Sequence, residues 1–316
     1  MDSIEHKTLQ LNGINMHVAS KGQGPKTILF VHGFPELWYS WRHQILALSD
    51  LGYRCIAPDL RGFGDTDAPE GVEKYTSLHV VGDLVALLDA VAPGEQVFVV
   101  GHDWGAYVAW HLSLYRPDKV KALVALSVAY LPRNPLGKPV DLMRHVYGPD
   151  YYFCRFQETG VIEAELAEVG TKRVIEGFLS HRSPAPLFLP KGKLFGDAPT
   201  QLPEWITEEE LNYYVTKYEK TGFTGGLNYY RVVNLNWELN AAWTGSPVIV
   251  PAKFIVGELD TVYNSLGAKQ YVNSPAFKKA VPQLEEVVAM EGVAHWIQQE
   301  KAEEVTNHIH DFFHKF

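Results

Sequence analysis

The sequence has little cysteine, no long apolar run and no surplus of basic residues. Its two cysteines, Cys55 and Cys154, are too few for a disulfide framework, and reduced thiols in a cytoplasmic protein are the simplest interpretation. No apolar stretch approaches the roughly 20 residues that would cross a bilayer. The first residues, MDSIEHKTLQ, show neither the basic nor the apolar part of a signal peptide. We therefore expect a cytoplasmic protein without a membrane span.

The charge balance is acidic, with 28 Lys and Arg against 37 Asp and Glu and a formal net charge of -9. Such a chain cannot neutralise many phosphates, so nucleic acid is not an expected partner. Hydrophobic residues make up 46% of the 316 residues. This is enough for one large α/β domain, or for a core with a second domain inserted in it.

Patterns typical of strands and helices alternate along both ends of the chain. The residues around Asn12-Gly13 alternate in polarity on either side of a hairpin turn. Beyond it, the sequence predicts buried strands in 26–33, 54–59, 97–100, 121–128, 252–260 and 284–290, and helices in 37–52, 76–91, 104–116 and 301–316. The last helix would cover the sheet with Val305, Ile309, Phe312 and Phe316. This alternation predicts an α/β fold with a mostly parallel central sheet and helices on both faces.

The pattern changes in the middle of the chain, where prolines, aromatic residues and helical segments dominate. Little in this region has the pattern of a buried strand, so we expect a helical insertion between two strands of the core. The predicted domains are a core of residues 1–130 and 247–316 and an inserted helical domain of residues 131–246.

The stretch VFVVGHDWGAYVAW, beginning at Val97, predicts a strand, a tight turn and a helix. Gly101 and Gly105 flank Asp103 as glycines flank the serine of the G-x-S-x-G nucleophile elbow. Asp103 could instead cap the helix, because aspartate is favoured at that position. A cap does not require glycines two residues away on both sides, whereas the strained elbow does. The pattern favours Asp103 as a nucleophile.

Other polar residues also follow predicted strands, at the sheet edge where open α/β folds bind their ligands. They are the His32-Gly33-Phe34-Pro35 turn, Asp260 and His295. The order of nucleophile, acid and histidine along the chain is that of the α/β-hydrolase triad.

Both partners of Asp103 have competitors. Glu258 and Glu238 could replace Asp260, but Asp260 follows its strand directly. His295 is one of 13 histidines, and it lies in the loop after the last predicted strand, where the base of such a triad belongs. The i, i+4 pair of His310 and His314 has no acidic or cysteine partners, so an exposed helix face is favoured over a metal site. We expect no metal and no cofactor.

An aspartate nucleophile predicts a particular kind of substrate. A serine that attacked a saturated carbon would form an ether, which water does not readily cleave. A carboxylate forms an ester instead, and water can attack that ester's carbonyl and regenerate the enzyme. The substrate is therefore expected to be an epoxide or a carbon–halogen compound. His295, supported by Asp260, would activate the water, and the backbone N–H groups of Phe34 and Trp104 would stabilise the oxyanion.

With these residues assembled, the chain resembles the soluble epoxide hydrolases of the α/β-hydrolase fold, and most closely the plant enzymes. The resemblance covers nearly the whole length and depends on HGFPELWYSWRHQ, APDLRGFGDTDAP, VGHDWGAYVAWHL, RFQETGVIEAEL, TGFTGGLNYYR, FIVGELDTVY and EGVAHWIQQE. It implies that the insertion is a helical cap, or lid, over the active site. It also implies an epoxide and water as reactants, with fatty-acid or aromatic epoxides as the expected substrates, and a monomer or homodimer.

The resemblance implies further site residues. Two cap tyrosines hold and protonate the epoxide oxygen in this family, and Tyr152 and Tyr230 match their positions, with the neighbouring Tyr151 and Tyr229 as alternatives. The family typically has a cis peptide before Pro35, in the turn that begins with His32 and Gly33. Glu36 and His102 resemble residues that help to hold the hydrolytic water. The cap side chains Leu187, Phe188 and Trp205 are candidates for the wall of a substrate tunnel.

Two other functions are possible on this fold. Haloalkane dehalogenases share the aspartate elbow, but they commonly have an asparagine that binds halide where this chain has Phe34, and they lack the paired cap tyrosines. A hormone-binding member of the fold is the other alternative, because fold does not determine function. Such a protein has no need for an aspartate nucleophile, a histidine base and two phenols together.

Overall fold

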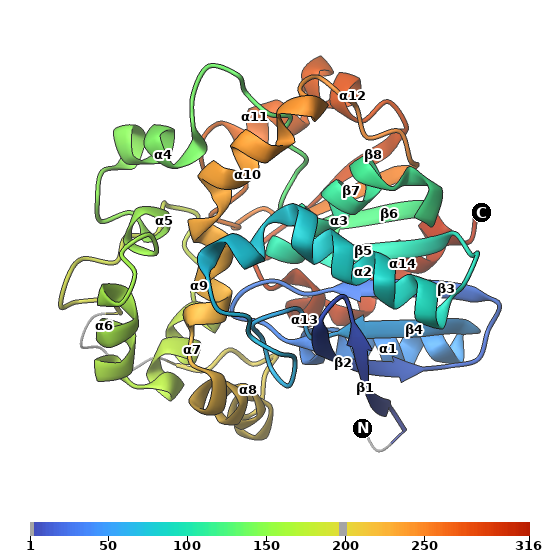
Figure 1. The fold of residues 1–316 in the computed structure, drawn as a ribbon, viewed down its shortest axis with the longest axis horizontal. Helices are drawn as coiled ribbons and strands as arrows, with labels where there is room; N and C mark the ends of the chain where they lie inside the picture. The colour runs from blue at the N-terminus through green and yellow to red at the C-terminus, as the bar shows by residue number, and fades with distance from the viewer. Residues whose placement is uncertain (1–2, 196–200) are drawn as a thin grey trace.

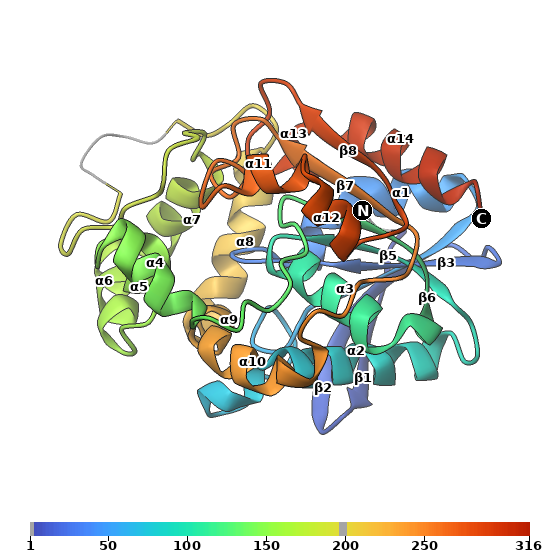
Figure 2. The same cartoon turned by 90° about the horizontal axis from the view of Figure 1, so that it is seen from above.

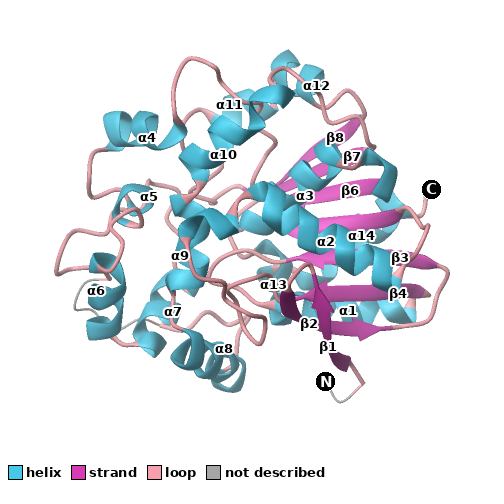
Figure 3. Cartoon of the chain, in the orientation of Figure 1, coloured by secondary structure: helices cyan, strands magenta, loops and turns pink. Residues whose placement is uncertain are grey.

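The computed structural model describes residues 3–195 and 201–316. Its centre is an eight-stranded sheet in the order β1-β2-β4-β3-β5-β6-β7-β8, shown in Figure 3. The strands are β1 (Glu5–Leu11), β2 (Ile14–Lys21), β3 (Lys26–Val31), β4 (Tyr53–Pro58), β5 (Val97–His102), β6 (Val120–Leu126), β7 (Ala252–Gly257) and β8 (Leu284–Met290). From β4 to β8 all neighbours are parallel, whereas β2 pairs antiparallel with both β1 and β4. The predicted mostly parallel α/β sheet is confirmed.

The antiparallel edge follows from the turn between the first two strands. Asn12 and Gly13 have φ angles of 48° and 81°, the left-handed pair that a two-residue hairpin of this kind requires. The predicted hairpin is therefore confirmed. It adds β1 at the edge, where most of the side chains are exposed.

The central strands are apolar on both sides because helices cover both faces of the sheet. All six residues of β5 and all six of β7 are buried. Helices α1 (Arg42–Asp50) and α14 (Ala302–Phe313) lie on one face, and α2 (Ser77–Val91) and α3 (Trp104–Tyr115) on the other (Figure 2). Cys55 and Cys154 are both buried and unpaired.

The last helix differs in one detail from its prediction. Val305, Ile309 and Phe312 are buried as expected, but Phe316 is 38% exposed. The prediction for Phe316 was wrong because α14 ends at Phe313, so the helical period no longer positions the final residue. Phe313 is buried in its place.

Helices dominate the chain between β6 and β7, as the sequence predicts. They are α4 (Pro139–Tyr147), α5 (Tyr152–Arg155), α6 (Val161–Val169), α7 (Thr171–Leu179), α8 (Glu208–Thr221), α9 (Thr224–Arg231) and α10 (Val233–Leu239). In Figure 1, helices α4 to α9 lie beyond one end of the strands. This is the carboxyl end, because side chains of this segment line a cavity together with Asp103, which follows β5.

The remaining helices are short. They are the helices α11 (Ala268–Val272), α12 (Pro275–Ala280) and α13 (Ile297–Glu300), and the 3-10 helices η1 (Trp38–Trp41), η2 (Val72–Tyr75), η3 (Pro117–Lys119) and η4 (Asn240–Trp243). Among the residues described, every helix is too short or too polar to cross a membrane.

Candidate active site

Asp103 stands at the turn between β5 and α3 with a φ of 53° and a ψ of -123°. At the two flanking positions there is no room for a side chain, so both must be glycine. A Cβ on Gly105 would lie 2.0 Å from the carbonyl oxygen of Val31, and one on Gly101 would lie 2.4 Å from the carbonyl oxygen of Gly105. The strained turn has the geometry expected of a nucleophile elbow.

The Asp103 side chain does not cap the helix. It accepts no hydrogen bond from the first turn of α3. Its Oδ1 instead accepts a hydrogen bond of 2.8 Å from the backbone N–H of Phe34. The capping alternative is therefore wrong, and the carboxylate faces the turn after β3.

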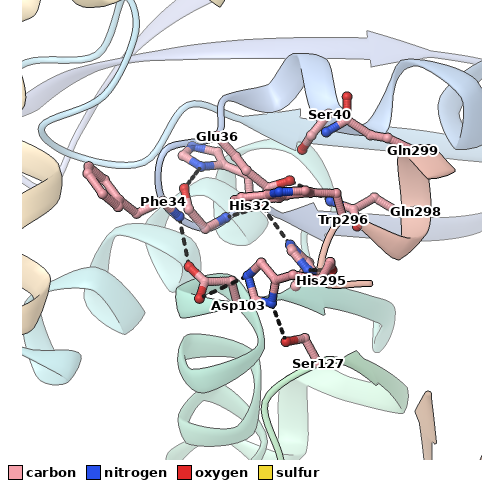
Figure 4. A network of polar contacts seen from close by, with 12 residues as sticks. His32, Phe34, Glu36, Ser40, Asp103, Ser127, His295, Trp296, Gln298 and Gln299 are labelled. Atoms are coloured by element: carbon pink, nitrogen blue, oxygen red, sulfur yellow. Dashed lines mark hydrogen bonds and ion pairs between the residues drawn. The ribbon is translucent and has the colours of Figure 1, made fainter. Parts of the chain in front are cut away.

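His295 lies between the carboxylates of Asp103 and Asp260, and Figure 4 shows its contact with Asp103. Its Nδ1 is 2.9 Å from Asp260 Oδ2, and its Nε2 is 3.6 Å from Asp103 Oδ2. Of the rival acids, Glu258 is exposed and Glu238 pairs with Lys138 at 2.6 Å. The structure thus brings Asp103, Asp260 and His295 together.

The two carboxylates determine the protonation of His295. Burial opposes the charged imidazolium, but Asp260 and Asp103 outweigh it and raise the pKa of His295 well above its ordinary 6.5. Burial would also raise the pKa of Asp260, yet the charge of His295 and the hydrogen bonds from His295, Ser127 and Val262 hold it below its ordinary value. The two carboxylates therefore favour the protonated form of His295.

The turn after β3 brings the Phe34 N–H to the nucleophile. A Cβ on Gly33 would lie 2.4 Å from Asp103 Oδ1, so only glycine fits there. The peptide between Phe34 and Pro35 is cis, as the resemblance implied. His32 fixes the turn: its Nδ1 is 2.9 Å from the Gly33 carbonyl oxygen, and its Nε2 accepts a 3.0 Å hydrogen bond from the Leu60 N–H.

Glu36 and His102 form a buried pair behind His295. Glu36 Oε2 lies 2.7 Å from His102 Nδ1 and accepts from the Gly33 N–H at 2.9 Å. His102 Nε2 donates to the carbonyl oxygen of His295 at 2.8 Å. Burial would raise the pKa of Glu36, but His102 and the Gly33 N–H lower it overall. Neither side chain is among those lining the cavity described next, so the pair braces the turn and the His295 loop.

A cavity lies over Asp103, with about 470 Å³ of empty space that is partly open to solvent. Its lining residues come from the core and from the inserted helices: Phe34, Asp103, Tyr152, Phe178, His181, Leu187, Tyr230, Thr261, Val262, His295 and Trp296. Trp104 begins α3, and its ring packs edge-on against Tyr230 with 4.9 Å between centroids.

The cavity distinguishes the predicted tyrosines from their neighbours. Tyr152 and Tyr230 both line it, with ring centroids 6.0 Å apart. Tyr229 instead donates to the Arg61 carbonyl oxygen at 3.0 Å, and Tyr151 packs on the Tyr147 ring. Burial, reinforced by nearby groups that include Asp103, raises the pKa of Tyr152 and Tyr230 well above 10, so both phenols stay protonated.

The cavity wall is only partly as expected. Leu187 lines it, but Phe188 and Trp205 do not, and Phe188 is 44% exposed. A place for Phe188 and Trp205 along a longer substrate tunnel stays a prediction, because the sequence does not show in which direction a loop side chain points. Phe178, His181, Thr261, Val262 and Trp296 were missed. Thr261 and Trp296 adjoin Asp260 and His295, and that adjacency was the available signal.

Phe34 connects the sheet to the inserted helices. Its ring packs edge-on against Phe156, Phe178, Phe223 and Tyr230, at centroid distances of 5.9, 5.8, 6.3 and 5.7 Å. A Cβ on Gly226 would lie 2.4 Å from this ring. One residue therefore contributes both the N–H that contacts Asp103 and the aromatic ring on which the inserted helices pack.

One group of residues outside the cavity has metal-ligand chemistry. The ligand atoms of His17, Asp59 and Asp65 lie within 4.8 Å of one another. His17 Nδ1 already contacts Asp59 Oδ2 at 2.8 Å, and Asp65 pairs with Lys217 and Lys220. These ion pairs account for the cluster. His310 and His314 are ring neighbours at 5.6 Å near the end of α14.

Comparisons with known proteins agree with this geometry. The family model for the alpha/beta hydrolase fold matches residues 26–302. The chain is 57% identical to epoxide hydrolase 1 of Siraitia grosvenorii, over all of both chains. The chain belongs to the epoxide hydrolases of the α/β-hydrolase fold.

The solved structures of epoxide hydrolases extend the likeness. Epoxide hydrolase I of potato (Solanum tuberosum) matches with a TM-score of 0.96 and 56% identity, covering 99% of this chain and all of that one. An epoxide hydrolase of Vigna radiata matches with a TM-score of 0.97 and 58% identity, covering 100% of this chain and 99% of that one. The predicted family, plant-type soluble epoxide hydrolase, and the predicted enzyme class are thus confirmed.

Proposed function

We propose that this epoxide hydrolase forms a covalent ester on Asp103, which water activated by His295 and Asp260 then hydrolyses to a vicinal diol. The observation that carries the proposal is the shared cavity, in which Asp103 lies 3.6 Å from His295 and close to two protonated phenols. A nucleophile, a base and two acids around one reacting centre are what this reaction needs.

In the first step, an oxygen of Asp103 bonds to an epoxide carbon. The bond from that carbon to the ring oxygen breaks, and its electron pair stays on the oxygen. Tyr152 or Tyr230 protonates this alkoxide, which gives a hydroxy ester. The resulting phenolate recovers its proton from the His295 imidazolium through solvent, so His295 becomes neutral. Ester formation favours this transfer because it removes one of the two negative charges that raise the pKa of His295.

In the second step, neutral His295 takes a proton from water while the water oxygen attacks the ester carbonyl of Asp103. The N–H groups of Phe34 and Trp104 donate hydrogen bonds to the developing oxyanion. The tetrahedral intermediate collapses to the diol and the Asp103 carboxylate, and His295 is again an imidazolium. The two steps consume one epoxide and one water and return every protein group to its starting state.

The supporting residues act by holding these groups in place. His32, Gly33 and Pro35 fix the turn that carries the Phe34 N–H, and Glu36 and His102 tie that turn to the His295 carbonyl. The resemblance implies that Glu36 and His102 also help to hold the attacking water. Their place behind the cavity wall supports an action through backbone groups.

Three observations favour this function over a dehalogenase or a binding-only protein. Halide leaves as a stable anion and needs N–H donors, whereas an epoxide oxygen needs an acid such as Tyr152 or Tyr230. The Phe34 side chain offers no donor to halide. A binding protein has no use for a histidine held as an imidazolium between two carboxylates.

The cavity wall supports lipophilic substrates. Phe34, Phe178, Leu187, Val262 and Trp296 give it an apolar surface around the reacting groups. Fatty-acid and aromatic epoxides suit such a wall. We further propose residues 131–246 as the cap domain on a core of 1–130 and 247–316, and a cytoplasmic enzyme that works as a monomer or homodimer.

A single turnover in ¹⁸O-labelled water, with enzyme in excess over styrene oxide, tests the mechanism. Water attacks the ester carbonyl, so the label is expected in Asp103, while the diol takes its new oxygen from the unlabelled carboxylate. Enzyme incubated in the same water without epoxide is the control and should stay unlabelled. Label that enters the diol and not Asp103 would show direct attack by water and refute the ester.

A further inference from the structure

Ser127 is a buried serine at the centre of the site that the reaction above does not use. It directly follows β6, between the strand that leads to Asp103 and the strand that leads to Asp260. Its Oγ donates to Asp260 Oδ2 at 2.6 Å and lies 3.0 Å from His295 Nδ1, as Figure 4 shows for the contact with His295.

The backbone of Ser127 is unusual as well. Its φ is 71°, in the left-handed region that residues other than glycine rarely occupy. Its N–H donates to the Ile255 carbonyl oxygen of β7 at 2.9 Å, which fixes the residue beside Asp260. Strain of this kind persists where the surrounding structure enforces it, often at functional sites. Asp103, the nucleophile of the proposed reaction, has a positive φ too.

The hydrogen positions follow from the groups present. A serine hydroxyl has one proton and two lone pairs. Because Asp260 is a carboxylate, the Ser127 proton points to its Oδ2, and a lone pair of Oγ faces the Nδ1–H of His295. That N–H is shared between Oδ2 at 2.9 Å and Oγ at 3.0 Å. Asp260 thus receives hydrogen bonds from Ser127, His295 and the Val262 N–H.

We infer that Ser127 is a positioning residue that orients Asp260 and His295 and limits how strongly Asp260 holds the proton on the histidine. The inference rests on the proposed function, in which His295 must be neutral to activate water. A hydrogen bond to Oδ2 disperses part of the carboxylate charge. Without it, Asp260 would stabilise the imidazolium more strongly, and the neutral base would form only at higher pH.

The other titratable groups around His295 are the same in the wild type and in a Ser127 variant. They are Asp103 at 3.6 Å, His102 with its ring 4.7 Å away, and His181 on the cap side, whose pKa is lowered by burial and by the charge of His295. Glu36 lies behind His102. A change in the pH dependence of a Ser127 variant therefore reports the loss of the Ser127 hydroxyl.

The test measures decay of the ester intermediate against pH after a single turnover with styrene oxide, in the wild type and in Ser127→Ala and Ser127→Gly. Both variants lack the hydroxyl, and glycine also relieves the positive φ. The pH at which decay reaches half its maximal rate should rise by about 0.5 to 1 unit in both, the effect of losing one hydrogen bond. Ser127→Cys, which keeps a weak donor, should lie in between.

Ser113→Ala is the matched control, because among residues 3–195 and 201–316 the hydroxyl of this buried serine bonds only within α3, to the Ala109 carbonyl oxygen. In this control, the pH at which ester decay reaches half its maximal rate should equal that of the wild type. Folded Ala and Gly variants with an unchanged midpoint would overturn the inference, even if their maximal rate fell. Absence of an adduct of substrate mass on His295→Gln, in which ester hydrolysis should fail, would instead overturn the proposed function, and this inference with it.

Discussion

The charge of Asp103 should control the proton on His295, and the variant Asp103→Asn isolates that effect. The His295 Nε2 and the nearest carboxylate oxygen of Asp103 are 3.6 Å apart. The asparagine keeps a side-chain oxygen for the Phe34 N–H and removes the charge. Its NH₂ also replaces the oxygen that faces His295 Nε2, and the loss of that acceptor acts on the imidazolium in the same direction. The pKa of His295 is expected to fall.

The distance between the two groups determines how far the pKa of His295 should fall. Two unit charges 3.6 Å apart interact with about 4.6 kcal/mol at an effective dielectric constant near 20, and with about 1.2 kcal/mol in water. At about 1.36 kcal/mol for each pH unit, these limits correspond to roughly 3.4 and 0.8 units. We therefore expect the His295 midpoint to fall by about 1 to 3 pH units.

A histidine-selective ¹⁵N NMR titration would measure this midpoint, with His295→Gln to assign its signal among the 13 histidines. Intact mass would verify that the asparagine persists. Asp118→Asn is the control, since it removes an equal charge from an exposed carboxylate paired with Arg116. Equal His295 midpoints in Asp103→Asn and the wild type, or an equal fall in the control, would refute the electrostatic argument.

Three further results are expected. His295→Gln should still form the ester but fail to hydrolyse it, so an adduct of substrate mass should accumulate; a protein free of adduct under excess epoxide would contradict this role. Tyr152→Phe and Tyr230→Phe should each slow ester formation, with a loss of up to about 10²–10⁴-fold in the double variant; rapid halide release from 1-haloalkanes with epoxide turnover unaffected would point to a dehalogenase. Gly105→Ala should lower the free energy of unfolding by about 1–3 kcal/mol because of its backbone clash, whereas Gly137→Ala, with open space around it, should not.

The parts predictable from sequence were those governed by local chemistry. The Asn12-Gly13 turn, the flanking glycines of Asp103 and the order of Asp260 and His295 each depend on a few neighbouring residues. The strand-end rule then placed these groups at one edge of the sheet. Because the cap tyrosines come from a segment without such rules, Tyr152 and Tyr230 required the family resemblance.

What the sequence did not reveal depends on tertiary packing. Ser127 lies within the predicted strand 121–128, one residue beyond the end of the observed β6, so the strand-end rule did not single it out. Nothing in ALSVAY shows that its hydroxyl meets Asp260. The absence of Phe188 from the cavity lining and the exposure of Phe316 depend on where a loop turns and where a helix ends. The hydrophobic periodicity of the sequence determines neither the direction of a loop nor the residue at which a helix ends.

The double role of Phe34 links the fit of a substrate to the rate of its reaction. Its N–H contacts the nucleophile at 2.8 Å, and its ring lies against side chains of the inserted helices. In the proposed reaction, a substrate bulky enough to displace those rings would also displace the N–H group that donates to the ester carbonyl. Discrimination by size would then appear in the turnover number, even among substrates that bind equally well.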